Sequence, residues 1–415
     1  MYNIHSHYEN ILSLVNKNNI DSPAVGYLFP FGSTKIDNIE FLKNPDSDSD
    51  PKIIFFCYDQ EPLFYSYNKK IFDQFKDLIP YKKIQSIPQK NYAYSETFKS
   101  KVLISEITKL IKINAPVILL NTEKNSEEKN KIFNEYNFID CYYFFHGFAA
   151  ADWYRGYEYC SDILPIKKRK INKKFISFNR ITGNSRVYRS FFVAELVKKN
   201  LIEQGHISYS KTCPVHGSLE KELLNAKSKY NLSAEYIKEV LYLLNVKLDR
   251  DLRIDTAQDL PIANDSFTIG PIQQSIESFL HIVTETCFWD KKQHLTEKIF
   301  KPIVLKQPFV LLGCVNNLSY LKEYGFKTFD KWWDESYDQC NDPIERINMV
   351  TKIIEDICKR PCHELENTLL EMEEILEYNY NRFYSKEFVQ DIWKELKTNL
   401  QFAVAQLPPQ TSAKT

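Results

Sequence analysis

Glycine is scarce in this chain of 415 residues: only ten are present, and no two of them stand two, four or five positions apart. The dinucleotide-binding motif G-x-G-x-x-G, the nucleophile elbow G-x-S-x-G and the phosphate-binding P-loop each need one of those spacings. The commonest forms of dehydrogenase, hydrolase and kinase are therefore excluded.

An excess of charge of either sign is also missing, since Lys plus Arg and Asp plus Glu both number 54. The chain therefore lacks the overall basic field that non-specific nucleic-acid binding requires. None of the eight histidines falls in an H-E-x-x-H motif, which excludes the usual zinc peptidase. The longest apolar runs, such as Pro308–Val315, are far shorter than the roughly 20 residues that span a bilayer, and the polar N-terminus does not resemble a signal peptide.

The nine cysteines are scattered through the chain, and their odd number argues against a framework of disulfides. We expect free thiols in a reducing compartment and hence a cytoplasmic protein. The pattern Cys358-x-x-x-Cys362-His363 can be read as a set of metal ligands. A second pair at ligand spacing is missing and Pro361 interrupts the pattern, so the sequence predicts no metal site.

The alternation of apolar and amphipathic runs predicts an α/β fold. Hydrophobic residues make up 43% and charged residues 26% of a chain long enough for two domains, which is the composition of a globular protein. Short β-branched and aromatic runs alternate with longer amphipathic ones, as in βα units around a parallel sheet. The predicted strands are Ala24–Phe29, Lys52–Tyr58, Pro116–Asn121, Cys141–Phe145, Lys174–Phe178, Phe279–Val283 and Pro308–Leu312. The predicted helices are Asn68–Leu78, Glu127–Tyr136, Ser185–Asn200, Leu219–Tyr230 and Ala234–Leu248, followed by a helical region from Pro343 to Leu400 with breaks near Pro361 and near Tyr378–Tyr384.

A basic, proline-marked segment, Leu164–Lys174, divides the chain. We interpret it as an inter-domain linker, with a nuclear-localisation or nucleic-acid patch as the alternative. It separates an N-terminal α/β domain (1–165) from a second one (172–375), which is followed by C-terminal helices that can cross back (376–404) and a flexible tail (405–415). Two doubly wound domains of this kind face a cleft at the carboxyl ends of their strands, where ligands bind.

The segment Phe279–Gly313 has the highest density of chemically functional residues. An apolar strand runs into Glu285, a polar loop follows, and Thr296 occupies the position of an N-cap before Glu297 and Lys298. Side chains and free N–H groups at such a helix start suit a phosphate and a ribose. The alternative is a surface Glu-Lys pair on an ordinary helix.

This segment resembles the donor-binding motif of the α-1,3-fucosyltransferase family, on the strength of Glu285, Thr296-Glu297-Lys298 and the strand Pro308–Gly313. Two further stretches resemble that family in the same order along the chain. They are Lys52–Pro62, an acceptor-domain strand that ends in Glu61-Pro62, and Phe175–Arg180 followed by Arg189-Ser-Phe-Phe-Val-Ala-Glu-Leu196. The chain departs from the family at Thr286, where Asn is usual, and at Gln293 and His294, which replace Asp and the Tyr that contacts the donor sugar.

The resemblance implies a GT-B fold and an inverting sugar transfer from a nucleotide-diphosphate donor, with GDP-fucose the first expectation and no metal or other cofactor. It implies that Glu61 takes the proton from the acceptor hydroxyl and that Lys298 and Arg189 neutralise the diphosphate. It also assigns Glu297 to the ribose or sugar hydroxyls. The remaining donor-site candidates are Glu285, His294 and Arg186, with Arg180 as a further alternative for the phosphate.

The same residues also have plain structural interpretations. Glu61 can be a strand-end carboxylate in a turn before Pro62, and the arginines can be surface charges of a helix. Asp59 would face the same way as Glu61 if the strand continued, so it competes for the role of base. His146, in Phe144-Phe-His146-Gly147-Phe148, is an acceptor-side candidate at a strand end, or else a core histidine.

Two other patterns have weaker functional readings. Asp46-Ser-Asp-Ser-Asp50 contains the D-x-D spacing of metal-dependent sugar transferases, but its position before Pro51 favours a solvated turn. Trp332-Trp333-Asp334 with Tyr337 can form a platform for a sugar, although paired aromatics more often fill a core.

The sequence thus predicts a glycosyltransferase that binds a nucleotide-sugar and does not span a membrane. Its acceptor can be a glycan, a lipid, a protein or a modified nucleic acid. The alternative is a non-catalytic binding or structural protein with the same fold. Glu61 together with Lys298 favours the enzyme, and the residues at 286, 293 and 294 favour the alternative.

Overall fold

The structure, a computed structural model, describes residues 7–17, 23–28, 39–43, 53–64, 116–213, 217–254 and 269–407. The chain forms two compact units. Unit 1 comprises Met1–Phe148 and Val389–Thr415, and unit 2 comprises Ala149–Phe388. Each unit has its own mainly parallel sheet with helices around it, so the α/β class predicted from the sequence is confirmed.

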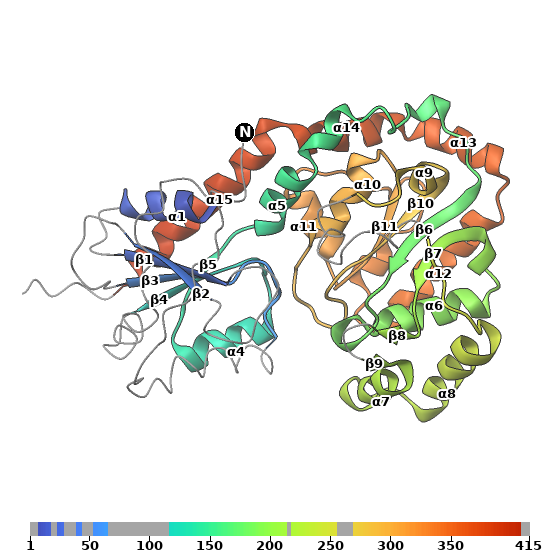
Figure 1. The fold of residues 1–415 in the computed structure, drawn as a ribbon, viewed down its shortest axis with the longest axis horizontal. Helices are drawn as coiled ribbons and strands as arrows, with labels where there is room; N and C mark the ends of the chain where they lie inside the picture. Colours follow the sequence, from blue (N-terminus) through green and yellow to red (C-terminus); the bar gives the residue numbers. More distant parts are fainter. Residues whose placement is uncertain are drawn as a thin grey trace, which may run out of the picture. The chain divides into compact units, whose positions relative to one another are not determined.

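Unit 1 is built on a five-stranded sheet with the order β2-β1-β3-β4-β5. Only the β1–β2 pair is antiparallel. In Figure 1, α1 and α4 lie on opposite sides of this sheet. The described elements are α1 (His7–Asn16), β1 (Pro23–Leu28), β2 (Ile39–Lys43), β3 (Ile53–Cys57), β4 (Val117–Asn121), α4 (Glu127–Tyr136), β5 (Ile139–Tyr142), the start of α5 (Phe145–Trp153) and most of α15 (Lys386–Ala405).

Local chemistry explains why these elements begin and end where they do. Strand β3 is buried along its whole length, as an Ile-Ile-Phe-Phe-Cys run between two layers should be. Helix α4 has the predicted bounds because Ser126 caps its start through a hydrogen bond from the Lys129 N–H (3.0 Å), and Asn137 ends it in the left-handed conformation.

The region after β4 differs from the prediction. Strand β5 ends at Tyr142, and Phe145 opens helix α5 instead of closing a strand. The run Phe144–Ala150 is buried throughout, and a short buried helix has no amphipathic period that distinguishes it from a strand. His146 therefore lies in the first turn of a helix. The predicted helix Asn68–Leu78 and the Asp46–Asp50 loop lie outside the described residues.

Unit 2 contains a four-stranded, all-parallel sheet with helices around it (Figure 1). Its strands are β6 (Lys173–Asn179), β7 (Gly205–Tyr209), β10 (Ser278–Thr284) and β11 (Phe309–Leu312), and a small two-stranded pairing joins β8 (Thr212–Cys213) to β9 (Gly217–Ser218). The α-helices are α6 (Tyr188–Lys198), α7 (Leu219–Lys229), α8 (Ala234–Tyr242), α9 (Ile272–Ile276), α10 (Phe300–Val304), α11 (Asn317–Glu323), α12 (Pro343–Cys358), α13 (Cys362–Glu371) and α14 (Glu373–Tyr384). Short 3-10 turns cover Arg155–Tyr159, Ile166–Lys168, Asn184–Arg186, Ile202–Gln204, Glu297–Ile299 (η9) and Ser336–Gln339, and a π turn covers Leu243–Lys247.

The strand order of both sheets creates a topological switch point. In unit 2, which has the order β11-β10-β6-β7, strand β7 lies on one side of β6, and the later strands β10 and β11 lie on its other side. The switch point is therefore between β6 and β10. In unit 1 the order places the same kind of switch between β1 and β3. In open α/β sheets, ligands bind at the carboxyl ends of the strands at such a point. These two edges are therefore where functional side chains are expected.

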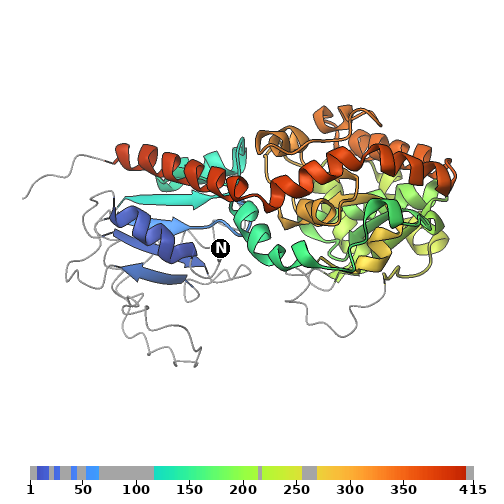
Figure 2. The same ribbon diagram turned by 90° about the horizontal axis from the view of Figure 1, so that it is seen from above.

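The C-terminal region is helical, as predicted. Pro361 separates α12 from α13, because proline has no backbone N–H to donate to the preceding helical turn and its ring clashes with that turn. The aromatic cluster Tyr378–Tyr384 lies inside α14, and the break comes directly after it, at Ser385. Figure 2 shows α15 running along the sheet of unit 1 on the side of β5. The Asn399 side-chain amide donates to the Tyr142 carbonyl oxygen there (2.7 Å).

The expected linker, Leu164–Lys174, belongs to unit 2, because the division into units falls after Phe148. Arg169 explains why a basic segment can be part of a compact unit. Its guanidinium is buried and donates to the carbonyl oxygens of Leu305 (2.7 Å) and Lys306 (2.9 Å). A long cationic side chain can thus be buried when backbone acceptors satisfy its donors.

Within the described part of the chain, every helix is too short or too polar to cross a membrane.

Candidate active site

The carboxyl edge of the unit 2 sheet is organised around Glu285, the first residue after β10. Its side chain is fully buried and accepts hydrogen bonds from the Thr296 backbone N–H (3.2 Å) and the Thr296 hydroxyl (2.6 Å). Burial raises the pKa of Glu285, and the Lys298 charge and the Thr296 hydrogen bonds act in the opposite direction. Glu285 therefore holds the start of η9 against the end of β10.

The neighbouring Gly313 leaves the room that this arrangement needs. A Cβ at position 313 would lie 2.9 Å from Asn317 Nδ2 and 3.5 Å from Glu285 Cβ. Asn317 in turn fixes the loop before η9, because its side chain accepts from the His294 N–H (3.2 Å) and donates to the His294 carbonyl oxygen (3.3 Å). A side chain at position 313 would therefore displace the Asn317 amide that holds this loop, whereas its contact with Glu285 would be an ordinary one.

Two cationic side chains meet beside this clamp. Lys298 Nζ and Arg186 Nη2 each lie 3.4 Å from the hydroxyl oxygen of Thr286. Lys298 Nζ also donates to the Thr296 hydroxyl (3.0 Å) and to Glu297 (3.0 Å). The Lys298 side chain is 29% exposed, so it is open to a ligand from solvent. Two positive charges beside a hydroxyl can bind the oxygens of a phosphate, which would then share Lys298 with its ion-pair partner Glu297.

The three candidate arginines have different surroundings. Arg189 is buried, and its guanidinium donates to the carbonyl oxygens of Ile181 (2.9 Å), Thr284 (2.7 Å) and, more weakly, Glu285 (3.3 Å). It joins the loop after β6 to the end of β10. Arg180 is exposed, whereas Arg186 is the arginine beside Lys298. Of the three, Arg186 is therefore the best placed to contact a phosphate.

His294 and Glu297 complete the predicted donor set. His294 is fully buried, and Glu297 is largely buried beside Lys298. Sequence reasoning did not identify Tyr154, whose pKa is raised by burial and further by the charges of Glu297 and Glu285. It also missed Lys301, whose pKa is lowered to about 8 by desolvation, with Glu297 opposing the shift. Lys301 could have been recognised from its position one helical turn after Glu297, whereas no local sequence feature distinguishes Tyr154.

Unit 1 carries a buried carboxylate at the end of β3. Asp59 accepts from the Tyr8 hydroxyl at Oδ1 (3.0 Å) and from the Tyr143 hydroxyl at Oδ2. His7 Nε2 lies 2.8 Å from the Tyr143 oxygen. Burial raises the pKa of Asp59 to about 7, against the two tyrosine hydrogen bonds, and lowers that of His7 to about 3. Asp59 therefore ties α1 and the end of β5 to β3.

Glu61 has a different environment from Asp59. Strand β3 ends at Cys57, so the two carboxylates do not share a strand face, and Glu61 is half-exposed while Asp59 is buried. A second strand-end acid, Glu123 after β4, accepts from the Leu63 N–H (3.2 Å) and so fixes the backbone that follows Glu61. His146 is buried in α5, where its ring packs edge-on against Phe145 (5.5 Å between centroids).

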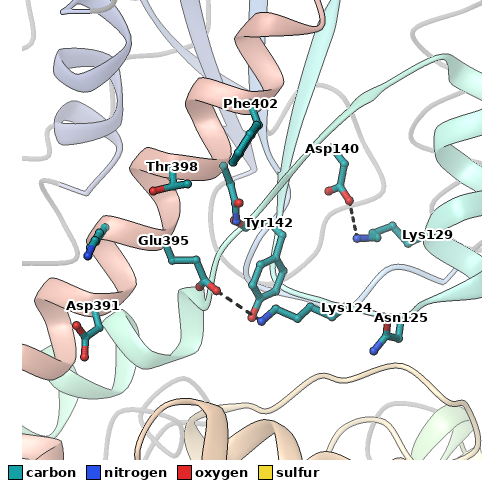
Figure 3. Close-up of a pocket in the computed structure, with 11 residues that line it drawn as sticks. Lys124, Asn125, Lys129, Asp140, Tyr142, Asp391, Glu395, Thr398 and Phe402 are labelled. Carbon is teal, nitrogen blue, oxygen red and sulfur yellow. Dashed lines mark hydrogen bonds and ion pairs between the residues drawn. The ribbon is translucent and has the colours of Figure 1, made fainter.

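Unit 1 also has a polar pocket of about 700 Å³ beside β5 (Figure 3). Lys124 and Glu395 form an ion pair across it (3.5 Å), and Lys129 pairs with Asp140 (2.7 Å). Its volume falls within the roughly 300–1,000 Å³ of small-molecule sites. The lining residues are Lys124, Asn125, Lys129, Asp140, Tyr142, Asp391, Lys394, Glu395, Thr398, Asn399 and Phe402. The three lysines and three acids cancel, so the pocket is polar without net charge.

The aromatic pair Trp332-Trp333 packs against Phe329, with ring centroids 6.2 and 5.3 Å apart. Tyr337 is buried and its hydroxyl accepts from the Leu311 N–H (3.3 Å), so it supports β11.

Comparison with known proteins adds no relative: no family model, no curated protein and no solved structure matches this chain.

Proposed function

We propose that this protein is an inverting glycosyltransferase of the GT-B type that uses a nucleotide-diphosphate sugar, with GDP-fucose the first donor to test. The observation that carries the proposal is the convergence of Lys298 and Arg186 on the Thr286 hydroxyl at the switch point of the unit 2 sheet. A departing diphosphate needs cations at that place, because negative charge develops on the leaving oxygen as the sugar is transferred.

The residues around the cation pair have complementary roles in the proposed donor site. Lys298 and Arg186 bind the diphosphate oxygens, and Glu297 accepts hydrogen bonds from ribose or sugar hydroxyls. Arg189, which we expected at the phosphate, instead keeps the loop after β6 and the end of β10 in register through its backbone contacts. It therefore acts as a positioning residue for Arg186 and Thr286.

The base is assigned to unit 1. Glu61 follows the central strand β3 at the switch point of its sheet and is half-exposed, so an acceptor hydroxyl can reach it. Buried Asp59 is the weaker candidate because both of its oxygens already accept tyrosine hydroxyls. The neutral polar pocket of unit 1 suits a polyhydroxylated group, since carboxylates and amides accept and donate hydrogen bonds to hydroxyls.

A non-catalytic nucleotide-binding protein with the same fold is the second candidate. One observation favours it: His294 replaces the family's sugar-contacting Tyr and is fully buried. A protein that keeps the phosphate site and loses the sugar contact would bind a nucleoside diphosphate without turning over its sugar conjugate. We propose a cytoplasmic location for either function, because the odd number of scattered cysteines argues against a disulfide framework.

A thermal-shift screen of nucleoside diphosphates and their sugar conjugates tests the proposal. A ligand present at a hundred times its dissociation constant stabilises the folded state by about 2.7 kcal/mol. We expect a guanosine conjugate to stabilise the wild type and an assay with mixed acceptors to release free diphosphate. Stabilisation without transfer to any acceptor would favour the binding protein, and no stabilisation by any nucleotide would contradict both.

A further inference from the structure

The turn that carries Arg186 is short and is held by contacts from outside it. It is a single 3-10 turn, Asn184–Arg186, whose first residue has a left-handed backbone conformation (φ 54° at Asn184). The residue before it, Gly183, has no side chain that could cap the turn. A left-handed backbone costs free energy in residues other than glycine, so neighbouring elements have to maintain it. The place of the Arg186 side chain therefore depends on those elements.

Trp289 makes the first of these contacts. Its indole Nε1 donates to the Ser185 carbonyl oxygen (3.1 Å), and Ser185 directly precedes Arg186. Trp289 lies three residues after Thr286, in the loop that follows β10. One side chain thus links the turn that carries Arg186 to the segment that carries Thr286, on whose hydroxyl Arg186 and Lys298 converge.

The indole ring of Trp289 is itself fixed by aromatic packing. It stacks on Tyr230 with ring centroids 3.8 Å apart and an interplanar angle of 8°. Phe191 and Phe288 pack nearly perpendicular to it, at 5.9 and 5.4 Å between centroids. Tyr230 is the C-cap of α7 and Phe191 belongs to α6. Because stacked and edge-to-face pairs are specific in their geometry, the indole N–H has a defined direction.

Helix α7 makes a second contact with the same turn. The side chain of Glu222 is buried, and its Oε2 accepts a hydrogen bond from the Asn184 N–H. The turn is therefore held at its first residue by Glu222 and at its second by Trp289. Both contacts come from α7 and the indole that stacks on its C-terminal end.

A fixed turn matters because Arg186 is weakly held by its own contact. Its Nη2 lies 3.4 Å from the Thr286 hydroxyl oxygen, which is longer than an ordinary N–H···O hydrogen bond. A long side chain that has to be ordered by the ligand lowers the affinity for that ligand, and a backbone that is already in place reduces this cost.

We propose that Trp289 is a positioning residue of the diphosphate site, which holds Arg186 in place through the Ser185 carbonyl, with Glu222 supporting the same turn. The inference rests on the proposed donor site, since it requires that Arg186 binds a phosphate. Trp289 acts through Arg186 and touches neither the base nor the sugar. Its contribution therefore concerns the diphosphate, whatever groups the diphosphate carries.

Calorimetric titration with GDP and with inorganic pyrophosphate tests this role. Trp289→Phe keeps an aromatic ring beside Tyr230 and removes the N–H donor, so both ligands should bind roughly 3- to 10-fold more weakly. Trp393→Phe, the same substitution at a half-buried tryptophan of unit 1, is the matched control and should change neither affinity. A loss for GDP alone would mean that Trp289 contacts the base, which would overturn the proposal.

A double-mutant cycle tests whether Trp289 acts through Arg186. In the Arg186→Ala background, Trp289→Phe should weaken GDP binding no further, because the side chain that it positions is gone. Additive losses of affinity from the two substitutions would contradict the role of Trp289 as a positioning residue.

Variants of Glu222 test the other contact with the turn. Glu222→Gln keeps an oxygen that can accept the Asn184 N–H and should retain the affinity for both ligands, whereas Glu222→Leu should weaken both. If Trp289→Phe fails to fold, this pair decides, and undiminished affinity in folded Glu222→Leu would overturn the proposal. A wild type that binds neither ligand would contradict the donor site and the role of Trp289 with it. Binding that depends on Arg186 but is unchanged in Trp289→Phe would overturn the role of Trp289 alone.

Discussion

Lys298 Nζ and Arg186 Nη2 lie at the same distance, 3.4 Å, from one hydroxyl oxygen, that of Thr286. Thr286 follows Glu285 at the end of β10, Arg186 ends the 3-10 turn before α6, and Lys298 belongs to η9. Three segments that are far apart in sequence thus supply one small cationic site. The proposed donor chemistry depends on this convergence.

The first prediction concerns the donor. Lys298→Ala should weaken nucleotide-sugar binding roughly 10- to 100-fold, since a hydrogen bond to a charged group contributes about 1.5–3 kcal/mol. Turnover should fall by a similar factor, because the contact exists in both the ground state and the transition state. Calorimetric titration measures the affinity, and Lys291→Ala, an exposed lysine of the same loop, is the control. Unchanged affinity in a folded Lys298→Ala variant would reject the donor site.

The second prediction separates the arginines. Arg186→Ala should reduce nucleotide affinity to a similar extent while leaving the melting temperature nearly unchanged. Arg189→Ala should mainly destabilise the protein, because it removes the Arg189 donor from the carbonyl oxygens of Ile181 and Thr284. Thermal melting and titration of both variants check this. Loss of affinity in a stable Arg189→Ala variant would return the phosphate contact to Arg189.

The third prediction concerns the base. Glu61→Gln preserves size and most hydrogen bonding but removes the proton acceptor, so donor binding and stability should be nearly unchanged. Turnover should fall by roughly two to four orders of magnitude, the usual contribution of a general base. Asp59→Asn should instead lower stability, because Asp59 accepts two buried hydroxyls. Activity lost in folded Asp59→Asn but retained in Glu61→Gln would reverse the two assignments.

The fourth prediction is a pH dependence of stability in unit 1. Burial raises the folded-state pKa of Asp59 from its ordinary value of 3.8 to about 7. The unfolded chain therefore loses this proton at lower pH than the folded one, and Asp59 lowers the free energy of unfolding as pH rises from about 4 to 7. The folded-state pKa of His7 is about 3, below 6.5, so His7 lowers stability as pH falls from about 6.5 to 3. The two contributions oppose each other over nearly the same interval.

Urea unfolding between pH 4 and 7 tests this opposition, with each variant compared with the wild type. The free energy of unfolding of Asp59→Asn should rise more steeply with pH than that of the wild type, because only the His7 contribution remains. The free energy of unfolding of His7→Gln should instead fall with rising pH relative to that of the wild type, because only the Asp59 contribution remains. Parallel curves for the wild type and both variants would show that the cluster does not titrate with folding.

The fifth prediction concerns metal dependence. The proposed donor site uses the Lys298 and Arg186 side chains to hold the diphosphate, so transfer should survive EDTA. Complete loss of activity with EDTA and recovery with Mn²⁺ would direct attention to the Asp46–Asp50 loop, which lies outside the described residues.

The sequence predicted the elements whose boundaries are set by local chemistry. The bounds of α4 follow from the Ser126 cap and the left-handed Asn137. Strands β3 and β10 were recognisable as apolar runs because both are buried on two faces. Strand β7 was missed because Gly205 and His206 make its beginning polar and only half-buried.

The donor-site roles depended on tertiary contacts that local patterns do not encode. Arg186 and Arg189 are three residues apart in similar sequence surroundings, yet one meets Lys298 and the other is buried against carbonyl groups. The position of β10 decides between them, and β10 pairs with the distant strand β6, for example through Ser278 and Lys173, as well as with β11. The convergence of Tyr8 and Tyr143 on Asp59 has the same non-local origin.

Unit 1 is discontinuous in sequence, because Val389–Thr415 belong to it together with Met1–Phe148. Helix α15 supplies six of the eleven residues that line the pocket beside β5, including Asn399, whose side-chain amide donates to the Tyr142 carbonyl oxygen. During synthesis, α15 can therefore reach the N-terminal sheet only after all of unit 2 has left the ribosome. Among the described residues, β5 forms the edge of the sheet that α15 lies beside, and an edge that stays open can pair with other nascent chains, so we expect the early folding of this protein to depend on chaperones.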